Sequence, residues 1–198
     1  MIDLTPELIE QNYNKFVSFA MKTGEHRIDA LKMFFAHFEE RLALCPASSR
    51  TYYHLAVPGG LVDHSLRVMK NCNRLMQVYK ENVDFSQEEM IMSCLFHDIG
   101  KLGDVDNERY VAQTNDWKVK QGQVYDYNPL LKYMTTSQMG LFLMQHFEIK
   151  LSYNEYMSIL LNDGPIVEEN RTYAMKEPLL AILVHQADRM ACEQEKKG

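Results

Sequence analysis

Two neighbouring residues, His97 and Asp98, carry side chains that can bind a metal ion together. They lie in the segment Leu95-Phe96-His97-Asp98-Ile99-Gly100-Lys101. Neighbouring residues in a helix point about 100° apart, so both can face one point only where the helix ends or is distorted. Gly100 supplies such an end. An imidazole nitrogen beside a carboxylate oxygen suits a divalent ion such as Mn, Fe, Co, Ni, Zn or Mg.

Two further segments offer ligands of the same kind. Gly59-Gly60 predicts a sharp turn that places His64 one turn into the following helix. Asp188 follows a run of apolar residues, and burying a carboxylate without a partner is costly. Either histidine alone is more often a packed core residue, but the combination favours a shared ion. A metal held by both segments and by the His-Asp pair would satisfy all four side chains at once.

The order of these residues resembles the HD superfamily of metal-dependent phosphohydrolases, in its HDIGK type. The resemblance covers about 45–192 and rests on these motifs: Pro46-Ala47-Ser48, Tyr53-His54, Gly59-Gly60-Leu61-Val62-Asp63-His64, His97-Asp98-Ile99-Gly100-Lys101 and His185-Gln186-Ala187-Asp188. It implies an all-helical fold around one metal held by His64, His97, Asp98 and Asp188. It also implies hydrolysis of a phosphoester or phosphoanhydride, in nucleotides or nucleic acid, by a water that the metal activates.

One segment departs from the family pattern. Members with two metals carry an extra histidine where Leu161-Asn162-Asp163-Gly164 has Asn162. An amide oxygen is a poorer ligand than an imidazole for these metals. We therefore expect one ion per chain, or a weak second site at Asn162 and Asp163. The departure also keeps open a metal-bound module that senses or binds a nucleotide with little activity.

Substrate contacts are predicted from cations and aromatic rings. Asp98 and Lys101 are the predicted catalytic residues, since Lys101 follows the His-Asp pair by about one turn and can reach a phosphate oxygen. A lysine exposed at a helix end fits that position equally well. Arg67, with Lys70 and Arg74, also fits a solvated helix face. The other predicted contacts are Arg50, His54, Arg67, Lys118 and Tyr127, with Trp117 as a second ring that can stack on a base.

The elements that must position these residues are helical. Helices are predicted after Thr5-Pro6-Glu7 and over about 26–43, 61–81, 86–97, 152–161 and 177–188, and the last one frays in the tail EQEKKG. Strand-forming residues predict a small β-hairpin or ordered loop around 109–127, with Thr114-Asn115-Asp116 as its turn. The predicted class is all-α, an HD helical bundle with this insertion. We expect a single domain over 1–198, in which helices within 1–44 pack on a core of 45–192.

Composition narrows the classes of function. The chain has 198 residues and a net charge of −6, which argues against a protein that grips duplex DNA by charge. The four cysteines lie far apart and form no CxxC, which predicts reduced thiols in a cytoplasmic protein: Cys45, Cys72, Cys94 and Cys192. No apolar run reaches the length of a membrane span, so no membrane partner is expected. A nucleotide or small phosphoester is the predicted substrate. An exonuclease acting on single-stranded ends is the alternative enzyme, although tracking a strand needs a basic groove. The oligomeric state is open.

Overall fold

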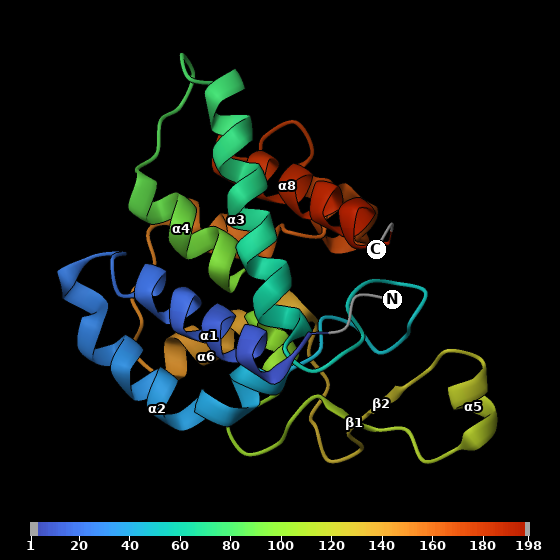
Figure 1. Ribbon diagram of the computed structural model, residues 1–198. Coiled ribbons are helices and arrows are strands. Elements are labelled where there is room, and N and C mark those ends of the chain that lie inside the picture. Colours follow the sequence, from blue (N-terminus) through green and yellow to red (C-terminus); the bar gives the residue numbers. More distant parts are fainter. Residues whose placement is uncertain (1–3, 197–198) are drawn as a thin grey trace.

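The computed structural model describes residues 4–196, and these residues fold mainly into helices (Figure 1). The α-helices are α1 (Pro6–Ala20), α2 (Ile28–Leu44), α3 (Gly60–Val78), α4 (Gln87–Phe96), α5 (Asp116–Lys120), α6 (Thr136–His146), α7 (Tyr153–Leu160) and α8 (Leu179–Glu195). Short 3-10 helices cover Glu25–Arg27, Ile99–Leu102, Gly164–Ile166 and Glu168–Tyr173. The strands are β1 (Tyr110–Ala112) and β2 (Tyr125–Tyr127). The predicted all-α class with a small hairpin is confirmed.

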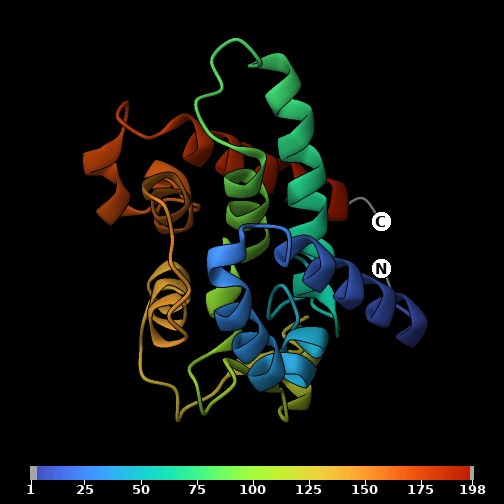
Figure 2. The ribbon, with the colours of Figure 1, turned by 90° about the vertical axis from the view of Figure 1, so that its left-hand side faces the viewer.

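A single large apolar core joins the N-terminal helices to the rest of the fold. α3 and α4 lie side by side, and α8 crosses them (Figures 1 and 2). Phe96, at the end of α4, packs against Phe16 of α1 and Phe34 of α2, with ring centroids 5.6 and 5.8 Å apart. All three rings are fully buried. The residue before the predicted His-Asp pair is therefore anchored in the core.

The start of α4 is held by a reciprocal cap. The Ser86 hydroxyl accepts a hydrogen bond from the Glu89 backbone N–H at 3.1 Å, and the Glu89 carboxylate accepts one from the Ser86 backbone N–H at 2.8 Å. The second Glu89 oxygen accepts from the hydroxyl of Ser152, which caps α7, at 2.6 Å. One glutamate thus ties the starts of two helices together.

Removing the Ser86 hydroxyl should weaken this cap. We expect Ser86→Ala to lower the free energy of unfolding by about 1 kcal/mol and the melting temperature by about 2–4 °C. Thermal denaturation followed by circular dichroism measures both. Ser18→Ala, at an exposed position inside α1, is the matched control and should not lower the melting temperature, because alanine favours helix interiors. Equal melting temperatures for the two variants would contradict the role of the cap.

The chain leaves the helical path directly after α4. Asp98 has φ −109° and ψ 11°, outside the α-helical range, and opens the 3-10 turn Ile99–Leu102. Gly100 lets this turn pack against α6, because a Cβ at Gly100 would lie 2.0 Å from the Thr136 carbonyl oxygen. A side chain there would force the turn away from α6. The predicted helix end at the His-Asp pair is thus present, and tertiary packing holds it.

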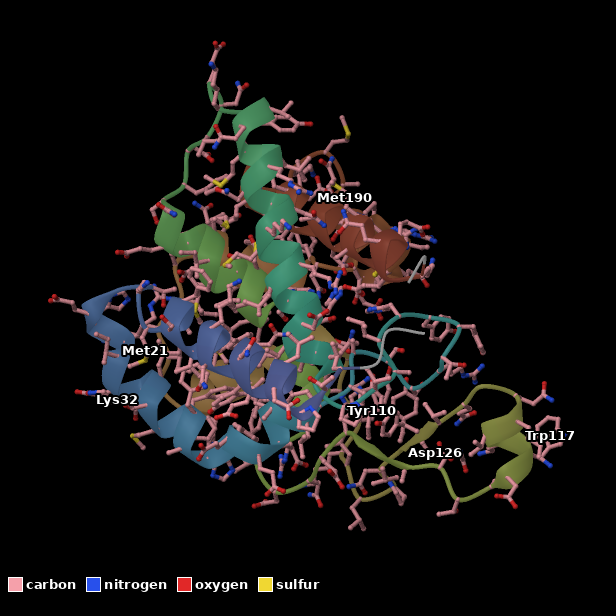
Figure 3. The ribbon with its side chains drawn as sticks, viewed as in Figure 1. Met21, Lys32, Tyr110, Trp117, Asp126 and Met190 are labelled. Atoms are coloured by element: carbon pink, nitrogen blue, oxygen red, sulfur yellow. The ribbon has the colours of Figure 1, made fainter. Side chains whose placement is uncertain are left out.

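The insertion around 109–127 is an antiparallel strand pair with a short helix between the strands. Tyr110 pairs with Tyr127 and Ala112 with Tyr125. The predicted turn at Thr114-Asn115-Asp116 is wrong in detail, because the Asn115 side chain caps α5 by accepting from two backbone N–H groups. Figure 3 shows this lobe projecting from the helical body.

Two helices differ from the predicted pattern. α8 does not fray after Asp188 but continues to Glu195, which is buried, while residues 197–198 lie outside the described part of the chain. α6 is missing from the predicted helices, although its capping box of Thr135 and Gln138 is a readable start signal. Within residues 4–196, no helix combines the length and the apolar character that crossing a bilayer requires.

Candidate metal centre

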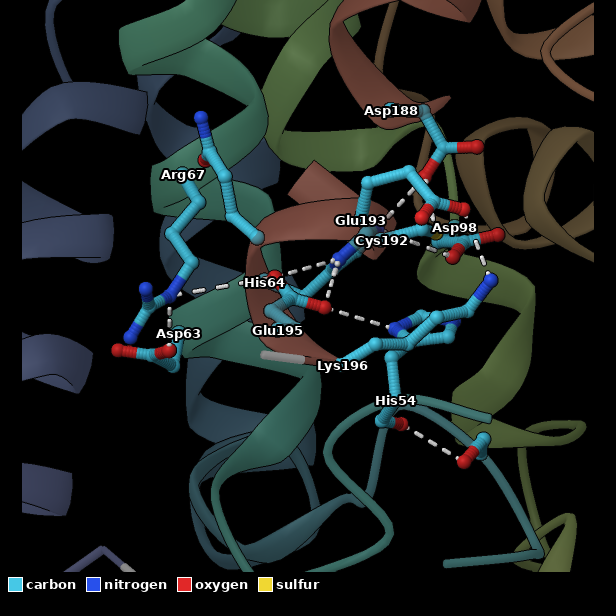
Figure 4. Close-up of polar contacts among 12 residues, drawn as sticks. His54, Asp63, His64, Arg67, Asp98, Asp188, Cys192, Glu193, Glu195 and Lys196 are labelled. Carbon is cyan, nitrogen blue, oxygen red and sulfur yellow. Dashed lines mark hydrogen bonds and ion pairs between the residues drawn. The ribbon is translucent and has the colours of Figure 1, made fainter. Parts of the chain in front are cut away.

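The four predicted ligands come from three parts of the fold that meet in the interior, and Figure 4 shows three of them: His64, Asp98 and Asp188. His64 lies in the first turns of α3, His97 and Asp98 follow α4, and Asp188 lies on α8. His97 keeps helical dihedral angles while Asp98 leaves them, so both neighbours face the same point.

His64, His97 and Asp188 each bring one donor atom within 4.8 Å of the other two, and Asp98 lies beside the two imidazoles without joining this group. His64 Nε2 is 3.0 Å from Asp188 Oδ1 and 3.8 Å from Asp98 Oδ2. His97 Nε2 is 3.5 Å from Asp98 Oδ2 and 4.0 Å from Asp188 Oδ1. Ligands held about 2.1 Å from one ion lie about 3.0 to 3.4 Å from one another in octahedral or tetrahedral arrangements. A small inward movement of the side chains would therefore allow these residues to hold one ion.

Both imidazoles are oriented so that Nε2 faces the centre. His97 Nδ1 lies 2.8 Å from the Cys94 carbonyl oxygen, which can only accept, so Nδ1 carries the hydrogen. His64 Nδ1 lies 3.1 Å from both oxygens of Glu195. His97 Nε2 is buried without a hydrogen-bond partner, and His64 Nε2 is buried with only the Asp188 carboxylate at 3.0 Å beside it. Two buried imidazole nitrogens that face carboxylates and no other donor or acceptor fit a divalent metal ion.

Glu195 belongs to the site although its role was not predicted. Its side chain is fully buried and also lies 2.9 Å from His54 Nδ1. On α8 it stands seven residues after Asp188, so both carboxylates lie on the same helical face. That spacing is the sequence signal that could have found it, but the charged tail around it is typical of a fraying helix end. A carboxylate behind a ligating imidazole orients the ring and raises its basicity.

Charges around the centre favour its ionised form. Burial lowers the pKa of His64, but the surrounding Asp188 and Glu195 carboxylates outweigh it and raise the pKa to about 9. Burial raises the pKa of Asp98, but Lys101 and the two histidines outweigh burial and bring it to about 2. The pKa of Asp188 is also lowered by the imidazoles, against the effect of burial. Without metal, the centre therefore pairs an imidazolium with two carboxylates.

Metal binding should release a proton from His64. With a pKa of about 9, His64 carries two ring protons at pH 7, and the ion needs Nε2 without one. We expect about one proton released per ion at pH 7. The affinity should rise about tenfold per pH unit and level off above about pH 9. Calorimetric titration in buffers of different ionisation enthalpy counts these protons. A binding enthalpy that is independent of the buffer at pH 7 would contradict the expectation.

Three of the predicted substrate contacts line a cavity of about 350 Å³ above the centre. They are Lys101, His54 and Tyr127, and the cavity also exposes Asp98 and Asp188. Lys101 Nζ lies 2.5 Å from Asp98 Oδ2, and this carboxylate raises the lysine pKa against the effect of burial. Asp163 also lines the cavity, and burial raises its pKa.

The structure does not bring the other three predicted contacts to this cavity. Arg67 turns to Asp63 at 2.6 Å, on the far side of His64 from Asp98 (Figure 4). Lys118 pairs with Asp126 at 3.1 Å in the projecting lobe. Arg50 donates to the Tyr52 hydroxyl. Trp117, the second predicted stacking ring, lies far out on the lobe, 69% exposed (Figure 3). The three cations therefore pair with residues two to eight positions away in the chain, and Trp117 faces solvent, all away from the centre.

Asn162 is buried beside the centre but faces it with its amide nitrogen. Nδ2 donates to the His97 carbonyl oxygen at 2.9 Å and lies 3.4 Å from Asp98 Oδ1. Its Oδ1 accepts from the Ser137 hydroxyl at 2.9 Å. Because the His97 carbonyl can only accept, this orientation is fixed. Asn162 therefore supports Asp98 and directs no oxygen towards an ion.

A second group of donor atoms lies next to the centre. His54, His64 and Cys192 bring one donor atom each within 4.8 Å of one another. Burial, together with the nearby Asp188 and Glu195 carboxylates, raises the pKa of the Cys192 thiol. A metal needs the thiolate, so this group is the less favourable of the two.

The comparison with protein families agrees with this geometry. The family described as HD domain matches residues 61–192, which is more than half of the chain and includes all four predicted ligands. The chain therefore belongs to the HD domain family, whose members are generally metal-dependent hydrolases that bind divalent metals. No curated protein and no solved structure matches the chain.

Proposed function

We propose that this protein is a metal-dependent phosphohydrolase that cleaves a phosphoester or phosphoanhydride bond of a nucleotide or a related small molecule. One observation carries the proposal: His64, His97 and Asp188 bring donor atoms within 4.8 Å of one another, with Asp98 beside the imidazoles, beneath a cavity of about 350 Å³ that lysine, arginine and tyrosine side chains also line. The two carboxylates face this cavity, and the imidazoles lie fully buried behind them. A phosphate group in the cavity would reach both the metal ligands and the cations.

Different residues would bind the metal, bind the phosphate and orient the imidazoles. A divalent ion held by His64, His97, Asp98 and Asp188 would lower the pKa of water and offset charge on a phosphoryl oxygen. Lys101, next to Asp98, can donate a hydrogen bond to a phosphoryl oxygen. The Cys94 carbonyl and Glu195 hold the two imidazoles with Nε2 facing the centre, so little reorganisation is needed during the reaction.

The net charge and the size of the cavity favour a small substrate. With a net charge of −6 the chain lacks the basic surplus typical of proteins that track nucleic acid. The cavity volume of about 350 Å³ lies at the lower end of the range for small-molecule sites. A single nucleotide therefore fits the proposal better than a long strand.

Metal analysis followed by an activity panel tests the proposal. Protein purified without chelator should contain about one divalent ion per chain. With metal, it should hydrolyse at least one nucleotide faster than a labelled single-stranded oligonucleotide. No ion and no activity with any added metal would overturn the proposal. Faster degradation of the oligonucleotide would indicate an exonuclease instead of the proposed enzyme. Thermal stabilisation by nucleotides without turnover would indicate a binding module instead.

A further inference from the structure

The cations that line the cavity differ in whether they have a carboxylate partner. Four side chains with a permanent positive charge line it: Lys101, Arg109, Arg189 and Lys196. Lys101 pairs with Asp98, while Lys196 and Arg189 lie 2.9 and 3.9 Å from Glu193. Within residues 4–196, Arg109 is the one of these four cations that forms no ion pair. Its charge is therefore available to an anion in the cavity.

Arg109 is held firmly at the base of the β1–β2 lobe. Its backbone N–H donates to the Leu102 carbonyl at 3.3 Å, and its carbonyl accepts from the Asn128 N–H at 2.9 Å. Its guanidinium carbon lies 5.3 Å from the centre of the Tyr127 ring, in a cation–π contact. Its Nε is buried without a hydrogen-bond partner. A buried N–H group without a partner is unfavourable, and an anion beside it would remove that cost.

Arg109 also stands where two cavities meet. The cavity above the metal centre shares Lys101, Arg109 and Tyr110 with a second cavity of about 390 Å³. Lys101 contacts Asp98, and Arg109, the residue before β1, lines both cavities together with Lys101. A ligand that begins at the metal centre can therefore extend past Lys101 to Arg109.

We propose that Arg109, backed by Tyr127, is a subsite for a second phosphate group of the substrate. This inference rests on the proposed function, in which the first phosphate lies at the metal centre. The planar guanidinium can donate two parallel hydrogen bonds to a phosphate. The cation–π contact with the Tyr127 ring helps to hold the guanidinium in place. The substrate class is then a nucleoside polyphosphate, with at least two phosphates in series.

The surroundings of Arg109 favour a small polyphosphate over a strand of nucleic acid. Glu40 and Glu108 line the second cavity beside Arg41 and Arg109. Arg41 is already occupied, because it donates to the carbonyl oxygens of Asp104 and Asp106. Further phosphates of a strand would approach the two glutamates without a free cation to receive them. A ligand that ends at Arg109 avoids this repulsion.

Binding of inorganic pyrophosphate and orthophosphate tests the subsite without turnover. Calorimetry on the metal-loaded full chain would compare wild type, Arg109→Gln, Arg109→Lys and Lys120→Gln, with metal content and melting temperature measured for each. We expect wild type to bind pyrophosphate about tenfold or more tightly than orthophosphate. Arg109→Gln should lose that preference, Arg109→Lys should keep part of it, and Lys120→Gln, an equal change of charge on exposed α5, should keep all of it.

The same preference in Arg109→Gln as in wild type would overturn the subsite. Tyr127→Ala is a second variant, for use if the arginine variants fold poorly, because Tyr127 is 57% exposed. It should weaken the preference for pyrophosphate over orthophosphate. In activity assays, Arg109→Gln should raise KM for a nucleoside diphosphate about tenfold or more and leave KM for the monophosphate unchanged. A rise for a dinucleotide only would overturn the polyphosphate class. Absence of all hydrolysis would overturn the proposed function, while the pyrophosphate preference still tests Arg109.

Discussion

Replacing Asp98 by asparagine should remove the bound divalent ion and lower metal-dependent hydrolysis by about 1,000-fold or more. Asp98 Oδ2 lies 3.5 and 3.8 Å from the two imidazole Nε2 atoms, so this oxygen completes the centre. Asparagine keeps the shape but removes the negative charge that a divalent ion requires. Loss of an ion that contributes several kcal/mol to the transition state corresponds to a rate loss of this order.

Metal analysis by mass spectrometry and a nucleotide hydrolysis assay would measure the two effects of Asp98→Asn. Asp63→Asn is the matched control, because Asp63 is also buried and adjacent to His64 in the chain but faces Arg67 and Asn12. It should keep about one ion per chain and most of the activity. Circular dichroism would show that both variants are folded. An Asp98→Asn protein with a full complement of metal would refute the proposed centre.

Truncating Glu195 should weaken metal binding without removing any metal ligand. Glu195 accepts hydrogen bonds from His54 at 2.9 Å and from His64 at 3.1 Å, and these bonds lower its pKa to about 2 although burial raises it. In Glu195→Ala both Nδ1 groups lose their acceptor, and the His64 ring is free to turn. We expect a metal affinity about 10- to 100-fold lower and a loss of about 3–5 kcal/mol in the free energy of unfolding.

Two further variants test whether the charge of Glu195 and its place in the helix are both needed for metal binding. Glu195→Gln keeps the shape and one acceptor oxygen, so its metal affinity should fall between those of wild type and Glu195→Ala. Glu193→Ala removes an exposed carboxylate from the same helix and should leave the metal affinity unchanged. Metal titrations and urea denaturation give both quantities. An affinity of Glu195→Ala within twofold of wild type would show that Glu195 does not position His64.

The local backbone around the predicted ligands could be read from the sequence because its signals are local. His97 and Asp98 are neighbours at a helix end, and His64 follows a glycine turn. The capping boxes of α4 and α7 begin where the sequence predicts them. The same holds for the strand pair of the insertion, whose residues favour extended backbone. Such signals depend on backbone preferences within a few residues, so they can be read without knowing the fold.

The partners of charged side chains depended on the tertiary structure. Arg67 and Lys118 pair with aspartates four and eight residues away, but Arg27 meets Glu155 128 residues away, and Arg109 forms no ion pair within residues 4–196. Glu195 sits in a tail that is typical of a fraying helix end, yet it meets histidines more than a hundred residues away in the chain. A charged side chain is stable in the interior only where packing brings it a partner, and contacts between distant segments determine which partner that is.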